Sequence, residues 1–151
     1  MQKRQELSMY RKNMATNVLL DTNIIMDIFD EERVSHDSSL TVIRELLGNG
    51  ATLYVNSDTL ATSFYLLRSL KKATLEESLY ALREITKICE LIPIEIQEVD
   101  EALSLCEDVE SPYKDYEDAL QYVCAKKIGA DLIVTNDKKF VSLDVELKST
   151  K

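Results

Sequence analysis

The sequence predicts a three-layer α/β/α fold with a central parallel sheet of about five strands. Short apolar segments rich in Val, Ile and Leu alternate with longer segments of helical period. This alternation is typical of a parallel sheet covered by helices on both faces. With 151 residues, of which 45% are hydrophobic, the chain has the size and composition to bury the core of one domain.

The expected strands are short segments rich in Val, Ile and Leu, and polar or turn-forming residues bound them. The segment that ends in Val-Leu-Leu before Asp21 is a representative case, because the chain becomes polar directly after it. On this basis we predict strands over residues 17–20, 51–55, 91–94, 131–134 and 143–147.

Apolar residues at helical spacing predict the connecting helices. They mark helices around residues 40–47, 60–67, 75–92, 99–109 and 116–124. Ser57 or Asp58 is expected to cap the second of these, and Pro93 to stop the third. The others end at Gly48-Asn49-Gly50, Ser111-Pro112 and Gly129.

Composition excludes several classes of protein. No apolar run approaches the ~20 residues that span a bilayer, so we expect a cytosolic protein with no membrane partner. Cys89, Cys106 and Cys124 lie in apolar stretches without a Cys-x-x-Cys pair, and His36 is the single histidine. A Cys/His zinc site is therefore excluded, and the composition argues against a Ser-His or Cys-His catalytic pair.

The charge is distributed unevenly. The chain carries −9, with +3 on residues 1–13 and −12 on residues 14–151. An acidic body suits a carboxylate metal site and attracts a basic partner protein. Because Met14 opens the run MATNVLLDTN, we expect residues 1–13 to be a disordered N-terminal extension and residues 14–151 to form the domain.

Acidic residues follow two of the predicted strands. Asp21 comes directly after the first strand, where the chain turns into a helix, and Asp137 lies three residues beyond Val134. Ligands of such sheets bind beyond the carboxyl ends of the strands, so the two carboxylates are expected to converge there. On the last helix, Asp115, Asp118 and Tyr122 have the spacing i, i+3, i+7, which places more acid beside the apolar face.

Clustered carboxylates repel one another unless a cation neutralises them. Oxygen ligands alone favour Mg²⁺ or Mn²⁺, which can activate water for attack on a phosphodiester. Each acid also has a structural alternative. Asp21 and Asp115 could be helix N-caps, Asp118 a solvated charge, and Asp137 a turn residue.

Two runs, VLLDTNIIMDIF and DYEDALQYVCAKKIGADLIVTNDKKF, resemble the PIN-domain family, whose members include the ribonuclease toxins of bacterial toxin–antitoxin pairs. The resemblance spans roughly residues 14–147. It implies a metal-dependent endoribonuclease with Asp21, Asp118 and Asp137 as metal-binding and catalytic acids. It also implies an RNA substrate, a basic antitoxin partner and a homodimer.

Further residues acquire roles from the same resemblance. Asn23 and Thr135 match polar positions that orient the acids, and Asp115 matches a position that is often acidic and would add a metal ligand. Many members carry a glutamate where this chain has Thr62, and Asp58 lies one turn earlier on the same helix face.

Basic residues near the expected site are candidates for binding RNA phosphates. Lys138 and Lys139 follow Asp137, and Lys138 directly adjoins the metal loop. Lys126 and Lys127 lie on the acidic helix; of this pair, Lys126 is the candidate.

Two other functions compete with the nuclease. An aspartate-nucleophile phosphatase needs a second Asp two residues after the first, where this chain has Asn23, which argues against it. The remaining alternative is a catalytically weak or inactive PIN-like module that binds RNA or protein, because the fourth acid is missing at Thr62.

Overall fold

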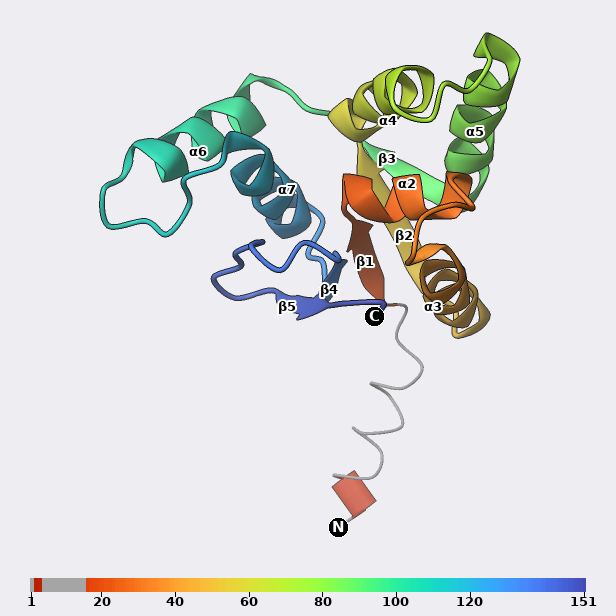
Figure 1. Ribbon diagram of the computed structural model, residues 1–151. Helices are drawn as coiled ribbons and strands as arrows, with labels where there is room; N and C mark the ends of the chain where they lie inside the picture. Colours follow the sequence, from red (N-terminus) through yellow and green to blue (C-terminus); the bar gives the residue numbers. More distant parts are fainter. Residues whose placement is uncertain (1, 4–15) are drawn as a thin grey trace.

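The computed structural model describes residues 2–3 and 16–151, and one parallel sheet lies between two layers of helices (Figure 1). The strands are β1 (Asn17–Leu20), β2 (Thr52–Asn56), β3 (Cys89–Ile92), β4 (Leu132–Val134) and β5 (Glu146–Lys148), in the sheet order β3-β2-β1-β4-β5. The helices are α2 (Thr22–Phe29), α3 (His36–Gly48), α4 (Ser57–Ser69), α5 (Leu75–Ile88), α6 (Ile96–Glu107) and α7 (Tyr116–Lys127). The predicted fold class is confirmed.

Alternation along β1 explains the two helical layers. Val18 and Leu20 pack in a cluster with residues of α2, α3 and α5. Leu19, between them, faces the opposite side and packs with residues of α6 and α7. Successive side chains of a strand point to opposite faces, so β1 contributes to both cores. Full burial of each of these side chains stabilises the fold by about 1.5–3 kcal/mol.

The third helix is shorter than predicted. The helix α5 ends at Ile88, and residues Cys89–Ile92 form β3, which pairs with β2 through Leu53 opposite Cys89. The apolar spacing that suggested a helix as far as Ile92 also suits a strand with both ends buried. Pairing with β2 satisfies the backbone of this segment while burying Ile92, so tertiary contacts override the local helical period.

Smaller differences concern boundaries. The cap of α4 is Asn56, whose Oδ1 accepts a hydrogen bond from the Thr59 N–H at 2.8 Å, and not Ser57 or Asp58. The last strand covers Glu146–Lys148, three residues later in its start than the predicted 143–147. All three of its residues are exposed, so pairing with β4, and not burial of an apolar segment, defines this strand.

Parallel pairing of β1 with β4 sets the position of the candidate site. Leu20 is the register partner of Val134, and the Asp21 N–H donates to the Val134 carbonyl at 3.0 Å. The two strands therefore end at the same level, and the residues that follow each of them emerge side by side. Helices α2 and α4 also begin at this edge of the sheet.

The predicted N-terminal extension, residues 1–13, lies outside the described residues apart from residues 2–3. Within the described part of the chain, no helix combines the length and the apolar character that crossing a membrane requires.

Candidate active site and metal centre

Asp21 is held from several directions at the end of β1. Its Oδ1 accepts hydrogen bonds from the Thr22 N–H at 2.8 Å and from Gln121 Nε2 at 3.2 Å. Its Oδ2 accepts from Asn23 Nδ2 at 2.9 Å and from Thr135 Oγ1 at 2.8 Å. Asp21 is the N-cap of α2 and at the same time the most firmly oriented acid of the cluster, with 5% of the residue exposed.

Asp137 lies in the loop after β4. Its N–H donates to Thr135 Oγ1 at 3.1 Å, and its Oδ1 accepts from the Lys139 N–H at 2.9 Å. Asp137 therefore stabilises the turn, which is the structural role that the sequence analysis gave as its alternative. It also lies close enough to Asp21 to raise the pKa of that carboxyl. Burial is the larger reason why the pKa of Asp21 is raised, and the hydrogen bond from Thr135 opposes it.

The helix α7 brings two more predicted acids. Asp115 is its N-cap and accepts a hydrogen bond from the Asp118 N–H at 3.0 Å. Partial burial raises the pKa of Asp118 to about 7, and the negative charges of Asp115, Asp21 and Asp137 add to the effect. The structure therefore brings together the four acids that the sequence singled out.

Asp115, Asp118 and Asp137 line a cavity of about 270 Å³. Lys139 contributes to the same lining, whereas Lys138 does not. Lys139 is therefore better placed than Lys138 to meet an anionic group in this cavity.

The lysines of α7 have internal partners. Lys126 Nζ lies 2.8 Å from Asp144 Oδ2, and Lys127 Nζ lies 2.7 Å from Glu98 Oε1. Neither lysine lines the acidic cavity, and Lys126 lines a different cavity beside α6, so it is not placed where the sequence analysis expected it to meet RNA at the site. Nothing in the sequence spacing revealed Asp144 or Glu98 as partners.

Sequence reasoning missed Gln121 and Glu117. Gln121 is 1% exposed; its Nε2 donates to Asp21 and to Thr59 Oγ1 at 3.3 Å, and its Oε1 accepts from Asn56 Nδ2 at 2.9 Å. The signal for Gln121 was an uncharged polar residue three positions after Asp118, on the same helix face. Its role is to link α7 to β2 and to Asp21.

Glu117 belongs electrostatically to the same cluster. Partial burial of its carboxylate raises its pKa, as do the charges of Asp21 and Asp115, while a hydrogen bond from the Thr22 side chain opposes the shift. Glu117 lines a second cavity, of about 200 Å³, together with Asp58, Thr62 and Gln121. Thr62 and Asp58 are therefore placed beside the site, next to an acid that α7 supplies.

The donor chemistry of the site fits Mg²⁺ or Mn²⁺. Every charged candidate ligand is a carboxylate, and hard divalent cations prefer oxygen. Among the residues that the structure describes, no three acidic, His or Cys side chains already enclose an ion position. An open arrangement suits these cations, because they dehydrate reluctantly and keep several waters.

Comparison with known proteins identifies the family of the chain. The family model described as PIN domain matches residues 18–146. The chain belongs to the PIN-domain family. It is 43% identical over 134 residues to "Ribonuclease VapC1" of Aquifex aeolicus (strain VF5), covering 89% of this chain and 90% of that relative.

Solved structures share the fold. VapBC2 from Rickettsia felis has a TM-score of 0.67 at 22% identity, covering 89% of this chain and 98% of that one. Mycobacterium tuberculosis VapC20, described as a Sarcin-Ricin loop cleaving toxin, has a TM-score of 0.65 at 11% identity, covering 83% and 98%. At these identities the likeness concerns the fold alone.

The raised pKa of Asp118 predicts how metal-free stability depends on pH. The folded protein holds this proton up to about pH 7, whereas the group ordinarily loses it near 3.8. The free energy of unfolding should therefore fall as pH rises through this window. Asp118→Asn should flatten that fall and raise the Tm at pH 7.5 in a chelator, measured by urea and thermal denaturation.

The matched control is Asp144→Asn. Hydrogen bonds from Lys126 and Tyr122 lower the pKa of Asp144, so the ionised carboxylate stabilises the fold and its loss should lower the Tm at neutral pH. If Asp118→Asn lowers the Tm as the control does, the carboxylate of Asp118 is not repelled by its neighbours.

Proposed function

We propose that this protein is a Mg²⁺- or Mn²⁺-dependent endoribonuclease and the toxin of a toxin–antitoxin pair. The observation that carries the proposal is the convergence of Asp21, Asp118 and Asp137 from two strand ends and one helix, with the pKa of Asp118 raised to about 7. The relative named Ribonuclease VapC1 supports ribonuclease chemistry. Residues 14–151 would form the nuclease domain, with residues 1–13 as an extension.

Mg²⁺ or Mn²⁺, when bound, would supply an activated water and stabilise the leaving oxygen of the phosphodiester. Asp21, Asp118 and Asp137 would hold the ion, and Asp115 would add a further carboxylate. Asn23 and Thr135 both donate to Oδ2 of Asp21 and keep the carboxylate oriented through these hydrogen bonds. Lys139, which lines the cavity, is suited to contact a phosphate of the RNA.

Asp137→Asn and Asp21→Asn should each weaken Mn²⁺ binding by more than about 100-fold, beyond the loss expected for a merely supporting residue. Cleavage of a structured RNA should fall to background in both variants. Calorimetric titration with Mn²⁺ and gel analysis of the RNA measure the two effects. The matched control is Glu101→Gln, which changes an acid of α6 and should leave both Mn²⁺ binding and cleavage unchanged. Unchanged cleavage by Asp137→Asn or Asp21→Asn would exclude this site.

The missing glutamate at Thr62 distinguishes an active nuclease from a binding module. The cavity beside Thr62 is already lined by Asp58 and Glu117, which we propose compensate for the lost acid. Compensation by an acid of α7 favours the enzyme, because the number of carboxylates near the ion is then preserved.

Thr62→Glu should tighten Mn²⁺ binding and raise cleavage at limiting metal, because it adds a carboxylate to this cavity. The helix α4 should tolerate the change, since Glu is a better helix former than Thr. Calorimetry of wild type, Thr62→Glu and the exposed control Thr86→Glu measures the affinity and stoichiometry. Equal values in all three proteins would mean that position 62 does not reach the metal ions.

We propose that a basic antitoxin binds a groove of about 600 Å³ between α2, α4 and α5. Its lining is apolar at Phe29, Leu67 and Tyr80. Three glutamates and one lysine also line it, Glu31, Glu76, Glu77 and Lys71, and this excess of acid suits a partner with apolar anchors and basic flanks. Several solved relatives were crystallised as VapBC complexes, such as those from Salmonella typhimurium and nontypeable Haemophilus influenzae. The groove lies at the C-terminal ends of α2 and α4, whereas the acidic site lies at their N-terminal ends, so a partner in the groove would have to extend along these helices to reach the site.

Tyr80→Lys should weaken partner binding by about 10-fold or more, because it replaces an exposed aromatic anchor with a charge that repels a basic partner. Co-purification with the product of the neighbouring reading frame, at low and high salt, measures the effect. The control Val109→Lys changes an exposed apolar residue outside the groove. Equal retention of the partner by both variants would exclude the groove, and sedimentation velocity checks the expected homodimer.

A further inference from the structure

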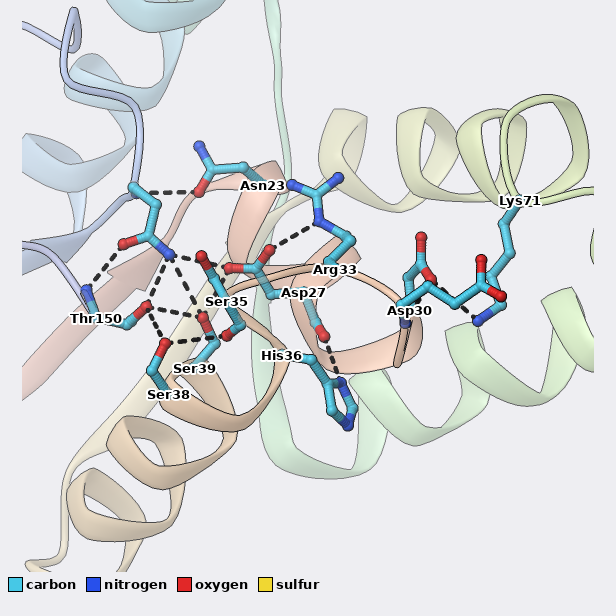
Figure 2. Close-up of polar contacts among 12 residues, drawn as sticks. Asn23, Asp27, Asp30, Arg33, Ser35, His36, Ser38, Ser39, Lys71 and Thr150 are labelled. Carbon is cyan, nitrogen blue, oxygen red and sulfur yellow. Dashed lines mark hydrogen bonds and ion pairs between the residues drawn. The ribbon is translucent and has the colours of Figure 1, made fainter.

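A second buried acid, Asp27, lies in α2 away from the acidic cavity, and 2% of it is exposed (Figure 2). Its Oδ1 accepts a hydrogen bond from Arg33 Nε at 2.8 Å. Its Oδ2 accepts from Ser39 Oγ at 2.7 Å and from Asn136 Nδ2 at 2.9 Å. A buried carboxylate without partners would be costly, so this set of donors is a requirement of the fold.

Asn136 connects Asp27 to the loop Thr135–Asp137, the metal loop, which follows β4. It lies between Thr135, which donates to Asp21, and Asp137. Its backbone N–H donates to Asn23 Oδ1 at 3.1 Å, and the amide of Asn23 donates in turn to Asp21 Oδ2 at 2.9 Å. One residue thus contacts the second buried acid with its side chain and the orienting partner of Asp21 with its backbone.

The other end of the Asn136 amide contacts the C-terminal segment. Its Oδ1 accepts from the Thr150 N–H at 2.8 Å and from Ser149 Oγ at 3.0 Å. Thr150 Oγ1 also lies 2.9 Å from Ser39 Oγ and 2.7 Å from Asn136 Nδ2. Figure 2 shows Arg33, Ser39 of α3 and Thr150 of the C-terminal segment around Asp27.

The orientation of the amide follows from these partners. A carboxylate only accepts, so Asn136 must present its NH₂ group to Asp27. The amide oxygen is then directed at the Thr150 N–H, which only donates. Flipping the amide would place donor against donor at Thr150 and acceptor against acceptor at Asp27.

We infer that Asp27 is a positioning residue that acts through Asn136 to hold the loop Thr135–Asp137 in place for metal binding. The inference rests on the proposed function for its metal-binding consequence. Asp27 itself contacts none of the acids of the cavity. Its effect is to fix the segment whose two ends are Thr135, the hydrogen-bond donor to Asp21, and the acid Asp137.

A purely structural role of Asp27 would require only its ion pair with Arg33. The ion pair between Arg33 and Asp27 ties the α2–α3 connection to α2 and needs only one oxygen of the carboxylate. The other oxygen is used by Ser39 and Asn136. The positioning role therefore predicts effects in the metal loop beyond a general loss of stability.

The test compares Asp27→Asn, Asn136→Asp and the double variant. In Asp27→Asn, an amide NH₂ replaces one acceptor, so either the Arg33 donor or the Ser39 and Asn136 donors lose their partner. In Asn136→Asp, two carboxylates face each other. In the double variant the groups are exchanged, the net charge is kept, and a donor again faces an acceptor at both positions.

Hydrogen–deuterium exchange of the metal-free protein is the first readout. Both single variants should increase exchange across residues 135–139, where the N–H groups of Asn136, Asp137 and Lys139 are bonded, and the double variant should restore protection. Mn²⁺ affinity is the second readout. Asp27→Asn should lower it by about 10-fold to 100-fold, the range for partners that orient metal ligands.

Glu98→Gln is the matched control, because Glu98 is an equally buried carboxylate whose lysine partner lies at the far end of α7. It should lower the Tm without changing exchange over residues 135–139 or Mn²⁺ affinity. If Asp27→Asn behaves like this control, Asp27 is structural and the inference is wrong. Should Asp27→Asn not fold, Asn136→Asp carries the test, because it replaces the amide that donates to Asp27 with a second carboxylate, and unchanged exchange over residues 135–139 in that variant would contradict the inference.

The two readouts separate the inference from the proposed function. If wild-type protein binds no Mn²⁺ while exchange changes as expected, the metal-dependent function fails and the control of the loop by Asp27 stands. If wild type binds Mn²⁺ and Asp27→Asn binds it equally with unchanged exchange, the positioning role alone is excluded.

Discussion

The parallel pairing of β1 with β4 is the constraint on which the candidate site depends. Because Leu20 and Val134 are register partners, Asp21 and Thr135 leave the sheet side by side. Thr135 Oγ1 donates a hydrogen bond to Asp21 Oδ2 at 2.8 Å. A shift of one residue would turn the side chains of β1 to the opposite faces and bring a polar neighbour, Asn17 or Asp21, into a position that an apolar side chain now fills. The two buried faces of β1 therefore fix the register, and the register fixes the distance between the first acid and the loop that carries Asp137.

Holding acids in this way opposes folding. Asp21 is buried and hydrogen-bonded in its ionised form, while Asp118, with fewer hydrogen-bond partners, has its pKa raised to about 7. The cluster thus contains Asp21, whose ionised carboxylate is stabilised by hydrogen bonds, and Asp118, whose charge changes near neutral pH. A cation would favour the ionised form of both, so metal binding and proton release should be coupled at this site.

Local rules were sufficient for part of this site. Asp21 and Asp137 follow apolar strands, so strand ends alone placed them, and Asp115 and Asp118 followed from helical spacing. Contacts between distant segments were not predictable from such rules. The end of α5 at Ile88 depended on pairing with β2. The ion pair of Lys126 depended on Asp144, which lies before β5 in the segment that the sequence analysis assigned to a strand. Gln121 and Asn136 escaped notice because an amide acquires its role only from the partners that surround it.

The paired lysines bear on how an acidic chain would bind RNA. Lys126 and Lys127 are committed to Asp144 and Glu98, so α7 offers its acids to the cavity while its cations are occupied elsewhere. Lys114 and Lys139 are then the cations that share the cavity with the acids. For the proposed nuclease, RNA phosphates would meet net negative charge unless a divalent cation is present, because the chain carries −9 overall. Substrate binding and metal binding should therefore support each other, and RNA bound away from the cavity would gain little from the protein surface.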